Sequence, residues 1–159
     1  MPANYNAIDL RWLWSGDYGL GPDGDFLDSS LDQIQSLEDD IMSVVQADLF
    51  DWEEYPSRAA SLSEFIGEPN TRDTAKALQQ RVSTALIANG VVRANDLQVR
   101  IIPIDVHRLM IIIKVLAQAN AQNSLQPGRA ATIAMVFDYM ERGILPVDLG
   151  VLDRNFFKD

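Results

Sequence analysis

Apolar and polar positions follow a helical period in two stretches of the chain. In residues 30–48 the apolar side chains recur every three or four positions and acidic residues fill the other face. This pattern predicts an amphipathic helix that Ser29 or Ser30 caps. Residues 71–89 show the same period, and Gly90 follows as a stop, so we expect a second helix there.

After the second predicted helix the apolar period changes from 3.6 to 2. Residues 97–104 alternate between apolar and polar side chains and predict a half-buried strand, whereas the nearly all-apolar residues 109–117 predict a strand covered on both faces. A polar connection, 118–129, leads to a third predicted strand at 131–137. The tail from 145 to 159 is expected to be a loop.

The remaining segments carry turn signals. Residues 9–14 alternate well enough for a short strand and run into a stretch rich in glycine and aspartate, so residues 1–28 predict a ribbon or arm. Residues 49–60 form an aromatic and acidic loop. Residues 62–66 allow one helical turn, which Gly67 closes.

These elements predict an α+β fold. We expect two main helices packed on a small, mostly antiparallel sheet of about three strands, with extended N- and C-terminal arms. The 159 residues suffice for one domain with a sizeable core. The expected units are an arm (1–28), an α+β core (29–117), and a C-terminal strand and tail (118–159).

Composition excludes several function classes. The chain has no cysteine and one histidine, His107, which argues against disulfides, thiolate metal sites and most zinc chemistry, and we expect no cofactor. The longest apolar run is five residues, 109–113, and the N-terminus lacks the order of a signal peptide. We therefore expect neither membrane insertion nor export, and assembly in the cytosol.

Charge is distributed unevenly along the chain. Residues 1–56 contain thirteen acidic residues and one base, Arg11, while residues 57–159 contain ten acids and twelve bases. Nucleic-acid binding requires clustered lysine and arginine, which the first third lacks. A basic protein partner suits this charge better than a nucleic acid does.

Two motifs in the N-terminal arm have a ligand-binding and a structural interpretation. The segment 19–24 fits G-x-G-x-x-G, but Pro22 lacks an N–H, no helix follows at once, and the surrounding aspartates would repel a pyrophosphate, so a flexible turn fits better than a dinucleotide site. Asp23, Asp25 and Asp28 offer oxygen ligands to a cation, although their spacing is not that of an EF-hand. An acidic turn before a helix explains the same residues.

Candidate catalytic residues are few. Asp51, Glu53 and Glu54 are the nearest approach to a glycosidase pair, whose carboxyl groups lie about 5 to 9.5 Å apart in a cleft. Three acids in one loop can satisfy that spacing by chance. His107 falls in a predicted hairpin turn, and the chain contains no G-x-S-x-G nucleophile motif.

Pro103 lies inside the strand predicted at 97–104. Because proline cannot donate to a ladder, this strand should lie at a sheet edge or be irregular. An edge accepts a strand from another chain, or Pro103 serves only to blunt it.

The order of features resembles the baseplate wedge proteins of contractile phage tails, the small T-even and Mu-type family with a "lysozyme-like" label. The resemblance covers residues 29–117 and rests on the order of its parts rather than on one motif. The parts are the acidic helix, the aromatic loop, the segment 62–70, the amphipathic helix 71–89, Gly90-Val91-Val92 and the two hairpin strands.

The resemblance implies a structural protein that is not an enzyme. It implies a small domain similar to the sheet-bearing domain of the tail sheath protein. This domain would link the baseplate to the first sheath ring and serve as a template for sheath assembly. The implied partners are other baseplate wedge proteins, the tail sheath protein and the hub or spike, with several copies in a six-fold baseplate. The implied location is the virion, after assembly in the host cytoplasm.

One family signature differs in this sequence. T-even-type members carry Glu-Pro-Arg after the long helix, where it helps bind the helical core bundle of the wedge. Here the segment 89–93 reads Asn-Gly-Val-Val-Arg, so only Arg93 corresponds to the signature. The Gly-Val step looks more like the Mu-type branch. Glu68-Pro69 precedes the helix and does not correspond to the signature.

We expect partner contacts at both ends of the chain. Trp12 and Trp14, with the acidic arm, are expected to contact wedge or hub, and Phe156 and Phe157 either anchor a neighbour or fold back on their own core. Two other hypotheses stay open: a peptidoglycan-cleaving muramidase that uses Glu53 or Glu54 as acid, and an acidic inhibitor or nucleic-acid mimic. Capture of one soluble basic partner from infected-cell lysate would favour the inhibitor or mimic over a tail protein.

Overall fold

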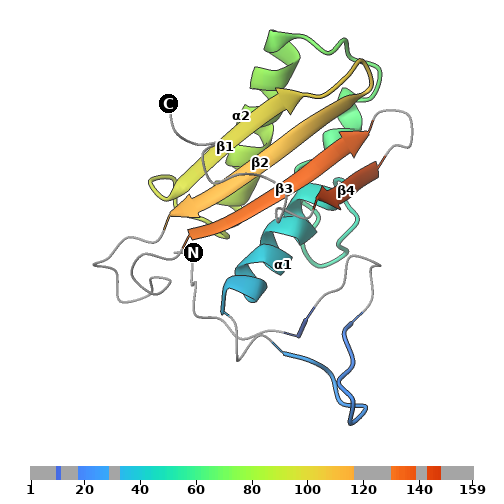
Figure 1. Ribbon diagram of the computed structural model, residues 1–159, viewed down its shortest axis with the longest axis vertical. Coiled ribbons are helices and arrows are strands. Elements are labelled where there is room, and N and C mark those ends of the chain that lie inside the picture. The colour runs from blue at the N-terminus through green and yellow to red at the C-terminus, as the bar shows by residue number, and fades with distance from the viewer. Residues whose placement is uncertain (1–9, 12–17, 29–32, 117–129, 139–142, 148–159) are drawn as a thin grey trace.

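The computed structural model describes residues 10–11, 18–28, 33–116, 130–138 and 143–147. It confirms the predicted α+β class, with two main helices on an antiparallel sheet (Figure 1). The units expected at 1–28 and 118–159 are described only in part.

Four strands form one antiparallel sheet in the order β1-β2-β3-β4. They are β1 (Leu97–Pro103), β2 (Arg108–Leu116), β3 (Ala130–Asp138) and β4 (Gly143–Val147). The first three agree with the predicted strands to within one residue at each end.

The fourth strand corrects the expectation of a loop from residue 145 onward. β4 pairs with β3 from Asp138↔Gly143 to Ala134↔Val147. Its five residues, GILPV, contain a glycine and a proline and are too few to show a period of two. This segment is a strand because β3 offers it an unpaired edge, which is a tertiary effect.

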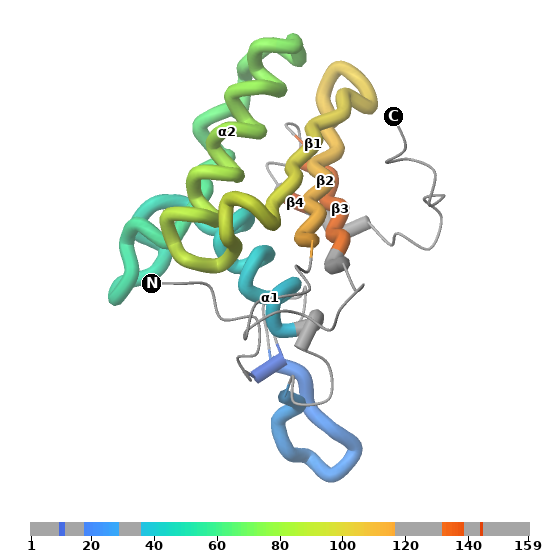
Figure 2. Tube along the Cα trace, turned by 90° about the vertical axis from the view of Figure 1, so that its left-hand side faces the viewer, coloured from blue at the N-terminus to red at the C-terminus, as the bar shows by residue number. Residues whose placement is uncertain are grey.

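Both helices contact the same face of the sheet, with α2 against β1 and α1 against β3 (Figures 1 and 2). α2 (Arg72–Ala88) begins at Thr71, whose side chain accepts a hydrogen bond from the Thr74 N–H, and it stops before Gly90, whose φ is 70°. This confirms the predicted second helix.

α1 (Gln33–Gln46) ends two residues earlier than predicted. The loop after it folds back, and the Ala60 and Ser61 N–H groups donate to the carbonyls of Val44 and Ala47. The loop thus supplies the hydrogen-bond donors that a longer helix would otherwise have supplied to these two carbonyls, and the helix ends at Gln46. The predicted cap at Ser29 or Ser30 lies outside the described residues.

The core lies between the helices and the sheet. From β1 it takes Val99, from β2 Leu109, Ile111, Ile113 and Val115, and the helical stripes supply Leu37, Ile41, Val44, Val45, Leu78, Val82, Ala85 and Leu86. On the opposite face of β2, Ile112 is only 1% exposed, while Met110, Lys114 and Leu116 are half-buried, so the expected cover on both faces is complete at Ile112 only.

One smaller prediction is also confirmed. Residues Leu62–Phe65 form a single 3₁₀ turn, and Gly67 follows it with a φ of 93°. Within residues 18–28 and at residue 10, the bridges Leu10↔Asp28 and Leu20↔Phe26 form a ribbon, which projects beyond α1 and away from the sheet (Figure 2), while the arm expected over the whole of 1–28 stays a prediction.

Candidate functional site

β1 lies at one edge of the sheet, as Pro103 predicts. Within the described residues, no strand pairs with its outer side. An edge strand presents unpaired backbone groups along that side, and these are the groups that pair with an added strand.

Hydrogen bonds at both ends of the β1–β2 hairpin fix which backbone groups point outward. The Leu116 N–H donates to the Asp96 carbonyl at 2.8 Å, and the Ile104 N–H donates to the Arg108 carbonyl at 2.9 Å. The register between them is continuous, from Leu97↔Val115 to Pro103↔Leu109. Because hydrogen-bonded pairs alternate in an antiparallel ladder, the even-numbered residues of β1 bond to β2 and the odd-numbered residues point outward.

The outer side of β1 therefore offers the N–H and carbonyl groups of Leu97, Val99 and Ile101. Pro103 occupies the next outward position, where its missing N–H costs no bond to β2. The side chains of Leu97, Val99 and Ile101 pack against the helix-covered core. Proline thus sits at the end of the edge and leaves the rest of it able to pair.

The opposite edge, β4, is a poorer site for strand addition. Residues 143, 145 and 147 pair with the β3 residues that face β4, so residues 144 and 146 point outward. Since residue 146 is proline, only Ile144 offers an outward N–H on this edge. β1 offers three.

The structure places two of the expected contact residues near β1. Arg93 lies in the connection between α2 and β1, where its carbonyl accepts from the Asp96 N–H, and Pro103 lies at the far end of the strand. The expected contacts Trp12, Trp14, Phe156 and Phe157 lie outside the described residues.

The G-x-G-x-x-G segment forms the tip of the ribbon. The Gly21 N–H donates to the Asp25 carbonyl at 2.7 Å, and Gly24 has a φ of 86°. The N–H groups of Gly21 and Gly24 are therefore engaged in a turn that lies between the bridged residues Leu20 and Phe26. A dinucleotide site would need them free at a helix start, so the turn interpretation holds.

The described aspartates of the ribbon, Asp23, Asp25 and Asp28, do not form a cluster that could hold a metal ion. Asp23 accepts a hydrogen bond from the Asp25 N–H through its own carboxylate at 3.3 Å, which shapes the turn. Among the residues that the structure describes, no cluster of three or more histidine, aspartate and glutamate side chains is arranged to hold a metal ion.

A second feature is a cleft of about 400 Å³ between the ribbon, α1 and the loop at residues 47–61. Backbone bonds anchor this loop, because Ala60 and Ser61 donate to the end of α1 and the Leu49 N–H donates to the Ser61 hydroxyl at 3.1 Å. Carboxylates and aromatic rings line the cleft. We call this the acidic–aromatic cleft, lined by Tyr18, Asp39, Asp40, Trp52, Glu54 and Tyr55 with neighbours on the same segments.

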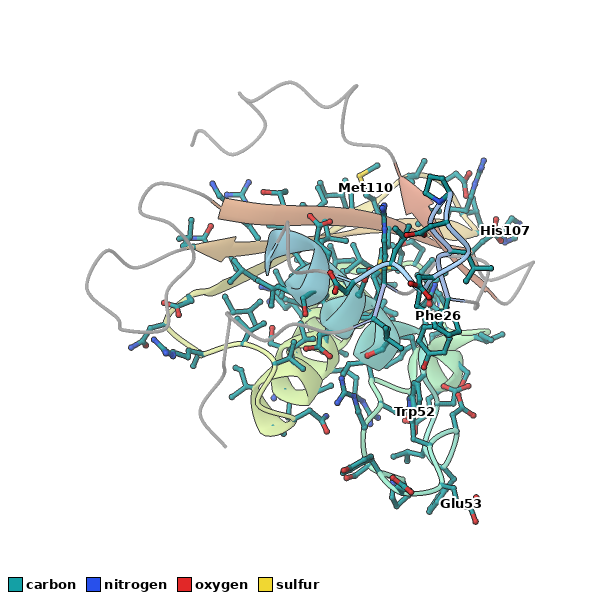
Figure 3. All side chains as sticks on the ribbon, turned by 90° about the horizontal axis from the view of Figure 1, so that it is seen from below. Phe26, Trp52, Glu53, His107 and Met110 are labelled. Carbon is teal, nitrogen blue, oxygen red and sulfur yellow. The ribbon has the colours of Figure 1, made fainter. Side chains whose placement is uncertain are left out.

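The predicted acidic residues of the loop do not form a buried catalytic pair. The Asp51 carboxylate accepts a hydrogen bond from the Asp48 N–H at 2.7 Å and so shapes the turn. Glu53 and Glu54 line the cleft but are exposed, and Figure 3 shows Glu53 at the outer end of the loop, farther from α1 than Trp52. A glycosidase general acid requires an apolar, desolvated pocket.

His107 is exposed in the β1–β2 hairpin turn, as predicted. Its backbone N–H donates to the Asp105 carboxylate at 2.8 Å, and Arg108 forms an ion pair with the same carboxylate at 2.6 Å. Donation from the His107 N–H, with the Arg108 interaction, lowers the pKa of Asp105 below its usual value. These contacts define a tight turn rather than a catalytic triad.

The sequence identified the aromatic and acidic loop but not the cleft. The cleft needs Tyr18 from the ribbon, Asp39 and Ser43 from α1, and Arg58 from the loop at residues 47–61. No local pattern links these positions. The available signal was the shared acidic bias of the ribbon, α1 and the loop.

Comparisons with protein-family models, curated proteins and solved structures find no match to this chain. Among the helices that the structure describes, none combines the length and apolar character needed to cross a bilayer.

Proposed function

We propose that the chain is a structural baseplate wedge component of a contractile phage tail. In this proposal it links the baseplate to the first sheath ring and templates sheath assembly by strand pairing. The order of features over residues 29–117 supports the proposal, as does the α+β fold. Its partners are then other wedge proteins and the tail sheath protein, and its location is the virion baseplate.

The outer side of β1 is the observation that carries this proposal. Three residues, Leu97, Val99 and Ile101, present both backbone groups to an added strand. Each hydrogen bond contributes a net stabilisation of about 0.5 to 1.5 kcal/mol, so strand addition can supply several kcal/mol with little demand on side chains. This fits a chain with no sharp catalytic motif.

Replacing Ile101 with proline tests the role of this edge. Ile101→Pro removes an outward N–H and leaves a carbonyl of the added strand without its donor, which weakens pairing by about 1 to 3 kcal/mol. Ile101→Val keeps the N–H and shortens the side chain, and it serves as the matched control. Each full-length variant is supplied in trans to a phage that lacks the gene, and tails are examined by negative-stain electron microscopy.

We expect baseplates without sheath from Ile101→Pro and sheathed tails from Ile101→Val. Normal sheathed tails from a folded Ile101→Pro protein would contradict strand pairing at β1. The chain's absence from purified virions, measured by mass spectrometry, would contradict the baseplate assignment itself.

The acidic–aromatic cleft keeps one enzyme hypothesis testable, because carboxylates and aromatic rings also line sites that bind polysaccharides. A muramidase would clear a suspension of bacterial cell walls, and Glu53→Gln with Glu54→Gln would abolish the clearing. Clearing by the unchanged chain that disappears in this double variant would replace the structural proposal.

A further inference from the structure

We propose that the acidic–aromatic cleft binds an arginine- or lysine-bearing segment of a partner protein. This inference does not depend on strand pairing, since the cleft involves α1, the ribbon and the loop at residues 47–61 rather than β1. It gives the protein a second interaction surface with a defined chemistry.

The charge of the cleft favours a cation. Among the residues that the structure describes, its lining includes four carboxylates, from Asp39, Asp40, Glu53 and Glu54, and one guanidinium, from Arg58. The described part of the lining therefore carries a formal charge of −3 at neutral pH. A phosphate or nucleic-acid ligand would be repelled, whereas a basic segment gains attraction on approach.

The cleft already holds one guanidinium of this chain. Arg58 donates to the Asp40 carboxylate at 2.6 Å and to the Ser43 hydroxyl at 3.3 Å. A carboxylate and a hydroxyl on one face of α1 thus show how the cleft binds this group. In the described part of the chain, Glu53 and Glu54 form no such ion pair, so their carboxylates are available to a second basic side chain.

Aromatic rings supply the other half of the recognition. Tyr55 is 62% exposed and Trp52 38%, and both line the cleft beside the carboxylates. Tyr18 reaches the cleft from the ribbon, where its ring packs edge-on against the Phe26 ring with 5.8 Å between the ring centroids. The stem of an arginine or lysine covers such rings while its charged end reaches carboxylates, and a guanidinium also stacks on an aromatic face.

A neutral oligosaccharide would also stack on these rings. It would gain nothing from the net negative charge, and it would not reproduce the Arg58 arrangement. The observations therefore favour a basic protein segment, and a neutral sugar becomes an outcome of the test.

The test measures binding of a labelled peptide that alternates glycine with three arginines to the full-length chain. Fluorescence anisotropy gives the Kd at low and at physiological salt. The neutral control peptide carries citrulline in place of arginine, and chitohexaose serves as the sugar probe. Circular dichroism confirms that each protein variant stays folded.

Two double variants have the same change in net charge. Glu53→Gln with Glu54→Gln alters the cleft, whereas Asp23→Asn with Asp25→Asn alters the ribbon tip outside the cleft lining and keeps an oxygen acceptor at residue 23. We expect the cleft variant to raise the Kd about tenfold and the ribbon variant about twofold or less. Trp52→Ala should raise the Kd about threefold.

Three results would overturn the inference. Equal losses in the two double variants would show attraction to the acidic chain in general. Equal binding of the citrulline peptide would show that charge is not recognised. Binding of chitohexaose that Trp52→Ala abolishes, without binding of the arginine peptide, would assign the cleft to a sugar. Ile101→Pro should leave peptide binding unchanged, which separates this surface from β1.

Discussion

The assignment of inward and outward backbone groups on β1 can be tested without any partner. Two neighbouring residues of β1, Arg100 and Ile101, have N–H groups that point in opposite directions. By the register, Arg100 lies opposite Ile112 in a hydrogen-bonded pair, and Ile101 lies opposite Ile111 in a pair that is not. Proline at each position therefore removes a different bond.

The magnitude follows from what each proline leaves unsatisfied. Arg100→Pro removes the donor to the Ile112 carbonyl, and Ile112 is 1% exposed, so we expect a cost of about 1 to 3 kcal/mol beyond the loss of the side chain. Ile101→Pro removes an N–H that points away from β2, so this cost is absent. The restriction of φ by the proline ring is common to both.

Alanine variants supply the side-chain controls. The free energy of unfolding is measured by urea titration with far-UV circular dichroism, and the value for Arg100→Ala is subtracted from that for Arg100→Pro, and likewise at Ile101. We expect the corrected loss at Arg100 to exceed that at Ile101 by about 1 to 3 kcal/mol. Equal corrected losses, or a larger one at Ile101, would refute the assignment and remove the basis for strand addition at β1.

Three further predictions follow from individual residues. Leu78→Ala should lower the free energy of unfolding by about 2 to 5 kcal/mol in urea titration, because Leu78 is fully buried between α2 and the sheet, and a loss under 1 kcal/mol would contradict that packing. Phe50→Asn should raise the free energy of unfolding by about 1 kcal/mol, since Phe50 has a φ of 72° and is 78% exposed, and asparagine tolerates that conformation; a lower melting temperature would argue against strain there. Because the pKa of Asp105 is lowered in the folded protein, its contribution to the stability of the hairpin is complete above the usual carboxyl range near pH 4 and is lost as the pH falls through the folded pKa. An NMR titration of Asp105 should therefore give a midpoint below that range. A midpoint within the range would contradict the turn contacts.

The strongest local patterns were the ones that the sequence alone could assign. The stripe of Leu78, Val82 and Leu86 and the capping residues Thr71 and Gly90 determine α2 because a helix bonds only within itself. The change of period after Gly90 predicts β1 and β2, because apolar residues at every second position lie on one face of a strand and a nearly all-apolar run suits a strand with two buried faces. Pro103 predicted an edge or irregular strand, because a regular central strand needs every N–H, and the sheet order shows that β1 is an edge.

Tertiary structure decided the parts that depend on pairing between distant segments. β4 is a strand because β3 presents an open edge to it, and no pattern within its five residues requires that. The end of α1 is set by Ala60 and Ser61, which reach its last carbonyls from a loop.

The two candidate interaction surfaces show the same division. From sequence alone, Pro103 predicted an edge or irregular strand, because proline has no N–H to donate. The acidic bias of the first third favoured a basic partner over a nucleic acid, because net charge follows from composition. Which backbone groups of β1 point outward, and that Tyr18, Asp40 and Trp52 share one cleft, follow only from the fold. Hydrogen-bond direction and the meeting of three segments are set by register and packing across the chain, which no local stretch of residues contains.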